Sequence, residues 1–160
     1  MKKLFFLVVA MIAAIGCSDD DRPSANFNST TVLDGTEFNP VRGTYFEAVP
    51  DMHRHVIFRM DEGQGSVSNM SIDLYIPFTQ SGITGQYDMG IGEADDALAS
   101  VYLSNGMQSY YISSINRLKV TELGNSRFKF EFIDAYGLVF QGGTVPFSGM
   151  IEGRFDLTAN

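Results

Sequence analysis

The chain has 160 residues, of which 44% are hydrophobic and 19% charged, and its formal net charge is −8 at pH 7. This length fits one domain, large enough to fold around its own core without disulfides or a metal. The acidic balance excludes nucleic acid as a partner, because phosphate backbones are repelled by a surface of their own sign.

Residues 1–16 have the organisation of a secretory signal peptide. Lys2 and Lys3 form a basic start, residues 4–15 are an unbroken apolar run, and small or apolar residues directly precede Cys17. The run is shorter than the roughly 20 apolar residues that cross a bilayer as a helix. We therefore expect residues 1–16 to be removed on export.

The residues Ala14-Ile15-Gly16-Cys17 resemble the lipobox of bacterial lipoproteins, in which the cysteine is lipidated and begins the mature chain. Cys17 is the only cysteine, so an intramolecular disulfide is excluded. A free thiol or an intermolecular bridge is the alternative, but the position after the apolar run favours lipidation. Each buried acyl methylene contributes about 0.8 kcal/mol, so a multiply acylated cysteine would be a stable membrane anchor.

The next residues, Ser18-Asp19-Asp20-Asp21, are similar to the acidic signal that exports some Gram-negative lipoproteins to the outer face. Ser18 is not the aspartate that signals inner-membrane retention in lipoproteins of the enteric type, so the resemblance implies the outer membrane. A solvated tether is the alternative interpretation, because acidic residues near a membrane stay hydrated. We interpret residues 17–28 as a lipidated cysteine with a flexible acidic tether.

Residues 29–160 have the pattern of an all-β domain. Short runs of β-branched and aromatic residues are separated by Gly, Pro, Asn and Asp, and no segment keeps a helical spacing. We expect an antiparallel β-sandwich or a partly closed β-barrel of about nine to eleven strands.

Three strands are expected in the first half of this domain, at residues 43–49, 55–60 and 71–78, with a glycine-containing hairpin between the last two. Alternate residues in the last two strands are apolar and should share the core face: Val56, Phe58, Met60, Ile72, Leu74, Ile76 and Phe78.

The second half contains two hairpin signals. Ser104-Asn105-Gly106 is one, because Asn and Gly both tolerate a positive φ, and Gly124-Asn125-Ser126 is the other. The second leads into the clearest strand, residues 127–132, where three Phe residues alternate with charged ones. Four residues near the end of the chain repeat this alternation and should also share a face: Ile151, Gly153, Phe155 and Leu157.

Four short motifs resemble those of small β-rich outer-membrane lipoproteins that carry acidic surface-export signals. They are Val32-Leu33-Asp34-Gly35-Thr36, Ile83-Thr84-Gly85-Gln86-Tyr87, Leu118-Lys119-Val120-Thr121-Glu122-Leu123 and Met150-Ile151-Glu152-Gly153-Arg154-Phe155. The resemblance implies an antiparallel β domain, but it carries no activity, ligand or catalytic residue.

Two groups of residues have side chains of the kind that bind metals. His53 and His55 share one face of an expected strand, but a zinc site needs more ligands than two imidazoles. The second group is a set of four carboxylates in a glycine-containing segment: Asp88, Glu93, Asp95 and Asp96. Their spacing does not match an EF-hand calcium loop. We interpret the histidines as exposed strand residues and the carboxylates as a solvated loop, and expect no metal or other cofactor.

Tyr45, Tyr75 and Tyr111 are candidate ligand-binding residues because all three lie on expected strands. Tyr45 and Tyr75 fall on the faces opposite the apolar ones, where aromatic rings can stack on sugars or on a partner. Ordinary cross-strand packing is the alternative, since strands favour tyrosine. The absence of tryptophan weakens the case for a glycan-binding platform.

No catalytic motif is present: the chain lacks a G-x-S-x-G elbow, and its one thiol is assigned to the anchor. We therefore expect a binding or structural module at the outer-membrane surface, not an enzyme, with a glycan or an envelope protein as partner. Two alternatives stay open, a barrel that holds a small apolar ligand and a small hydrolase acting on envelope or extracellular glycans.

Overall fold

The computed structural model describes residues 26–48, 54–63, 68–89, 97–114, 117–139 and 142–159. The expected signal peptide, Cys17 and the acidic Ser18-Asp19-Asp20-Asp21 segment lie outside these residues. Among the residues that are described, no helix is long and apolar enough to span a membrane.

The described residues form thirteen strands and no helix. The strands are β1 (Asn28–Ser29), β2 (Thr31–Leu33), β3 (Thr36–Phe38), β4 (Arg42–Ala48), β5 (Arg54–Asp61), β6 (Ser68–Ile76), β7 (Gly85–Met89), β8 (Leu98–Asn105), β9 (Ser109–Ser114), β10 (Arg117–Gly124), β11 (Arg127–Val139), β12 (Thr144–Arg154) and β13 (Asp156–Leu157). The prediction of an all-β domain is therefore confirmed.

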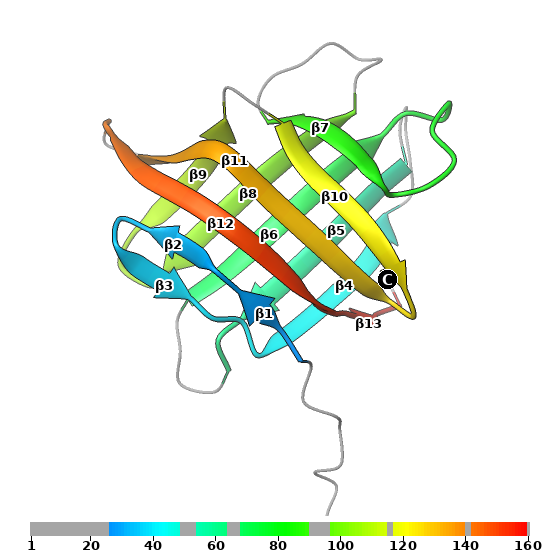
Figure 1. The fold of residues 1–160 in the computed structure, drawn as a ribbon, viewed down its shortest axis with the longest axis horizontal. Coiled ribbons are helices and arrows are strands. Elements are labelled where there is room, and N and C mark those ends of the chain that lie inside the picture. Colours follow the sequence, from blue (N-terminus) through cyan, green and yellow to red (C-terminus); the bar gives the residue numbers. More distant parts are fainter. Residues whose placement is uncertain are drawn as a thin grey trace, which may run out of the picture.

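All thirteen strands belong to one sheet, in the order β13-β4-β5-β6-β8-β7-β10-β11-β12-β2-β3, with β1 on β12 and β9 between β8 and β11. In Figure 1, β10, β11 and β12 run across β5, β6 and β8, which lie behind them. Only Phe155 separates β12 from β13, and β13 pairs with β4, so the sheet bends back toward its own first strands. This arrangement has the two packed layers of a sandwich and the returning sheet of a partly closed barrel.

Two details differ from the expected architecture. The strands outnumber the nine to eleven expected, and two pairs, β7 with β8 and β13 with β4, are parallel, so the sheet is mixed. Each parallel pair joins only two residues of each strand, Asp88 and Met89 to Leu98 and Ala99 in the first. Ladders this short leave no alternation in the sequence that would reveal them.

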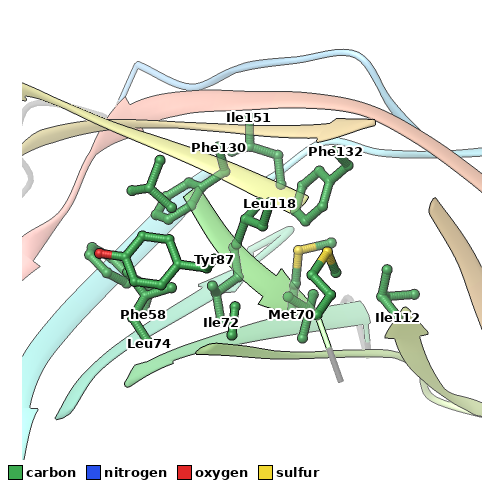
Figure 2. Close-up of a cluster of buried hydrophobic side chains, with 14 of the residues drawn as sticks. Phe58, Met70, Ile72, Leu74, Tyr87, Ile112, Leu118, Phe130, Phe132 and Ile151 are labelled. Atoms are coloured by element: carbon green, nitrogen blue, oxygen red, sulfur yellow. The ribbon is translucent and has the colours of Figure 1, made fainter. Parts of the chain in front are cut away.

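The core lies between the two layers and contains a cluster of phenylalanines. The ring of Phe58 on β5 lies 4.9 Å from that of Phe128, 5.0 Å from that of Phe130 and 5.2 Å from that of Phe155, each in an edge-to-face arrangement. Aromatic pairs favour this geometry because a ring's positive edge meets the negative face of its neighbour. Figure 2 shows Phe130 and Ile151 facing the side chains of β6 across this core.

The folded domain begins slightly before residue 29, where we expected it to start. Phe27 packs edge-to-face on Phe155, with ring centroids 5.1 Å apart, and Asn28 pairs with Glu152 of β12. A Cβ on Gly153 would lie 2.2 Å from the Phe27 ring. The aromatic ring therefore occupies space that only glycine leaves open, and it holds Phe27 against β12.

Two residues assigned to the core face are exposed. Phe78 follows Pro77, which has no N–H to continue the ladder, and the chain turns there as the N–H of Gln80 donates to the Pro77 carbonyl at 2.9 Å. Leu157 is exposed because the chain leaves β12 after Arg154 and changes its pairing partner in β13. Both errors come from extending an alternating pattern past the true end of a strand.

Candidate functional site

A hollow of about 620 Å³ lies on the outer face of β8, β9 and β11. Its side chains include Tyr102, which is 46% exposed, Met107, which is 94% exposed, and Leu138. The described residues that line it are Tyr102, Met107, Gln108, Ser109, Tyr111, Leu138 and Val139. Exposed apolar surface gathered in one hollow is typical of a binding site, because most exposed hydrophobic residues are scattered singly.

The register of three strands builds the centre of this hollow. Tyr102 on β8 is directly opposite Tyr111 on β9, and Tyr111 is directly opposite Leu138 on β11. Side chains alternate along each strand, so the adjacent residues Val101 and Ile112 point the other way and are fully buried. The core thus holds the three outward side chains in one row across the sheet.

The β8–β9 turn sets one border of the hollow. The Asn105 side-chain oxygen accepts hydrogen bonds from the backbone N–H groups of Met107, at 3.3 Å, and Gln108, at 2.9 Å. Gly106 adopts a positive φ of 82°, as the Asn-Gly signal predicts, whereas Asn105 serves as an acceptor and has no positive φ. These bonds hold the exposed Met107 beside the tyrosine row.

A separate aromatic pair lies on β5 and β6, outside the described residues that line the hollow. The rings of His55 and Tyr75 stack, with centroids 4.5 Å apart and planes 17° from parallel. Burial raises the pKa of Tyr75, and the nearby Asp73 and Tyr111 add to the rise. Of the three tyrosines proposed from the sequence, Tyr75 and Tyr111 both point away from the core, because their strand neighbours Leu74, Ile76 and Ile112 are fully buried. Only Tyr111 is among the described residues that line the hollow.

Tyr45 does not belong to this surface, and its predicted outward orientation is wrong. Its ring stacks on Phe58 at 5.6 Å and packs edge-on against Phe128 at 5.3 Å, both of which are core residues. The neighbouring Phe46 points outward instead, with the Arg59 guanidinium 5.2 Å from its ring centre. Two adjacent aromatic residues gave the sequence pattern no way to decide which of them faces the core.

Charge is distributed unevenly along the strands. No Asp, Glu, Lys, Arg or His occurs in residues 97–116 or 135–151, which contain β8, β9, the second part of β11 and most of β12. The outer face of β10 and the first part of β11 carries ion pairs instead. Lys119 and Lys129 bind the Glu131 carboxylate at 2.9 and 3.0 Å, and these bonds lower the pKa of Glu131.

The structure brings together no metal site at the candidate ligands that it describes. Asp88 forms an ion pair with Arg117 at 2.7 Å, and His55 is stacked on Tyr75. Among the described residues, no group of three or more His, Cys, Asp or Glu side chains is placed to hold a metal ion. The other candidate ligands lie outside the described residues: His53, Glu93, Asp95 and Asp96.

Sequence reasoning missed Tyr102, Met107 and Leu138 as members of the site. The one available signal was the long charge-free run that contains the first two. Comparison with protein-family models, curated proteins and solved structures found no match to the chain.

Proposed function

We propose that this chain is a lipid-anchored protein of the bacterial outer membrane, exposed at the cell surface, that binds a partner through the hollow on β8, β9 and β11. The observation that carries the binding role is the row of outward Tyr102, Tyr111 and Leu138 beside the exposed Met107. The hollow's volume falls within the roughly 300–1,000 Å³ usual for ligand sites.

The anchor is supported by the sequence alone. A basic start, an apolar run too short to span a membrane, and a single cysteine after Gly16 form the pattern that is lipidated in bacterial lipoproteins. The acidic residues after Ser18 support export to the outer face.

The apolar-ligand alternative requires space inside the sheet. The described interior is instead filled by side chains such as Phe58, Phe130 and Phe155, which pack ring against ring.

The hydrolase alternative requires carboxylates that converge in a cleft with shifted pKa values. The pKa of Glu131 is lowered by hydrogen bonds from two lysines on an outer face, where the carboxylate is held in ion pairs. Neither alternative gains support from these features.

Fatty-acid labelling and protease treatment of intact cells test the location. The wild-type chain should take up label, fractionate with the outer membrane and be digested on intact cells, whereas Cys17→Ala should carry no label. Replacing Asp19, Asp20 and Asp21 with Ala should keep the label and reduce digestion. Fatty-acid label on the Cys17→Ala variant would contradict lipidation at Cys17. Digestion of the acidic-segment variant to the same extent as wild type would contradict the role of these residues in export.

The binding role is tested separately with residues 18–160, which contain every described strand and lack the lipid. This fragment should sediment with cell envelopes prepared from cells that lack the protein, and Tyr102→Ala should reduce sedimentation. Leu123→Ala is the matched control, because Leu123 on β10 is also 46% exposed but lies outside the hollow. An equal loss in both variants, or in neither, would refute the role of the hollow.

A further inference from the structure

We propose that the hollow on β8, β9 and β11 binds an uncharged oligosaccharide, an inference that rests on the proposed binding role of this surface. Its lining combines aromatic and aliphatic side chains with hydroxyl and amide groups. A sugar has the same combination, with C–H faces that pack on rings and hydroxyls at its edges that donate and accept hydrogen bonds.

The polar groups of the hollow match a polyhydroxylated ligand. Tyr102, Tyr111 and Ser109 have hydroxyls that both donate and accept, and the Gln108 amide does the same through its two ends. A Gln108 oxygen already accepts a hydrogen bond of 2.6 Å from the Tyr110 hydroxyl. The Gln108 amide nitrogen is thus oriented by a buried neighbour, while its position at the lining leaves it available to a ligand.

The lack of charge argues against ionic ligands. None of the described lining residues is charged, and the two segments that carry them, 97–116 and 135–151, contain no ionisable Asp, Glu, Lys, Arg or His. The net charge of −8 repels an anionic ligand at long range, and the described lining offers neither a guanidinium nor an ammonium to offset that repulsion. A cationic ligand would find no carboxylate in this lining.

The spacing of the row also suits a sugar chain. Neighbouring strands lie about 4.8 Å apart, which is comparable to the length of one pyranose ring. Tyr102, Tyr111 and Leu138 occupy three adjacent strands in direct register, so they can contact successive sugar units along the row.

A second protein surface fits these observations less well. A stable interface typically engages about 20–30 residues on each side, whereas the hollow is lined by seven described residues. Self-association of this chain through the same face is therefore an outcome that the experiment must be able to detect.

The test uses the full chain purified in a detergent whose headgroup contains no sugar. The probes are maltotriose, cellotriose and triacetylchitotriose, with trigalacturonic acid as the anionic control. The chain has no Trp, so its intrinsic fluorescence comes from seven Tyr residues, of which Tyr102 and Tyr111 line the hollow, and calorimetry supplies the affinity. At least one neutral trisaccharide should bind and change the tyrosine emission.

The variants locate the site. Tyr102→Ala and Tyr111→Ala should each weaken binding of that trisaccharide by about tenfold or more, while Leu123→Ala should keep the wild-type affinity. Circular dichroism of each variant checks that the fold is retained. Sedimentation at increasing protein concentration checks for self-association.

Three outcomes would overturn the inference: no binding of any neutral trisaccharide, equal binding of trigalacturonic acid, or self-association that Tyr102→Ala abolishes. If no sugar binds while envelope sedimentation still depends on Tyr102, the binding role stands and its ligand is not a neutral oligosaccharide. If sedimentation is also insensitive to Tyr102→Ala, the binding role fails as well.

Discussion

His55 and Tyr75 stack face to face across β5 and β6, with ring centroids 4.5 Å apart. The imidazole lies beneath the phenol, and its buried Nε2 has no hydrogen-bond partner in the described part of the chain. The stack on Tyr75 is the ring contact that the structure shows for this imidazole.

Removing the Tyr75 ring should destabilise the domain, since aromatic pairs contribute about 0.5–1.5 kcal/mol beyond the area they bury. Tyr75→Ala should lower the free energy of unfolding, whereas Tyr75→Phe, which keeps the ring, should change it little. A double-mutant cycle with His55→Ala, measured by urea denaturation, isolates the pair. Additive losses would mean that the stack contributes no coupling energy.

Adjacent residues of β11 should respond in opposite ways to truncation. Phe130 is 0% exposed and packs against Phe58 and Phe155, so Phe130→Ala should cost about 3–5 kcal/mol through the cavity it leaves. Lys129 lies on the other face, in an ion pair with Glu131, so Lys129→Ala should cost no more than about 1 kcal/mol. Denaturant melts of both variants measure the contrast, and similar losses would contradict the packing.

The strand containing these residues was predictable because its apolar residues alternate without interruption from Phe128 to Phe132, and all three are buried. Tyr45 was not predictable in the same way, because it is followed directly by Phe46 and either ring suits the core. In the structure Tyr45 faces the core, because its position on β4 is directly opposite the buried Phe58 on β5.

The hollow was only partly predictable for a different reason. Tyr111 could be assigned to a strand from the sequence, but its meeting with Leu138 depends on the register between strands distant in the sequence. A bulge between Phe132 and Ala135 also interrupts the pairing of β11 with β12 just before this part of β11, and the sequence pattern does not reveal it. The β-propensity of the residues and their alternation therefore predict where the strands lie, while the site depends on how distant strands are aligned with one another.

Gly153 should not tolerate a side chain, because an added Cβ would lie 2.2 Å from the Phe27 ring. Gly153→Ala must displace the ring or shift β12, and overpacking of this kind costs about 1–3 kcal/mol. Gly82→Ala is the matched control, since a Cβ there meets no atom within 4 Å. Thermal denaturation compares the two variants.

Phe27→Ala provides a second check on this explanation. Phe27→Ala alone should destabilise the domain by removing a ring that packs on Phe155. Combined with Gly153→Ala, it should cost less than the sum of the two single losses, because the clash is gone. Additive losses would show that the methyl group introduced by Gly153→Ala destabilises the domain for a reason other than its contact with Phe27.

Glu131 should make the stability of the fold depend on pH in the acid range. Hydrogen bonds from Lys119 and Lys129 lower the pKa of this carboxyl in the folded protein below its ordinary value of 4.5. A lowered folded-state pKa means that the carboxylate stabilises the fold fully above the unfolded-state pKa, and that this contribution is lost as the pH falls through the folded-state pKa. Glu131→Gln removes this pH-dependent contribution.

Urea denaturation at neutral pH and at successively lower pH measures the effect. Wild type should exceed Glu131→Gln in stability at neutral pH, and the difference should shrink as the pH falls below 4.5. Replacing Lys119 and Lys129 together with Met should flatten the acid dependence in the same way, because the bonds that shift the pKa are then absent. A constant difference between wild type and Glu131→Gln across this range would show that the carboxylate is not stabilised by the two lysines.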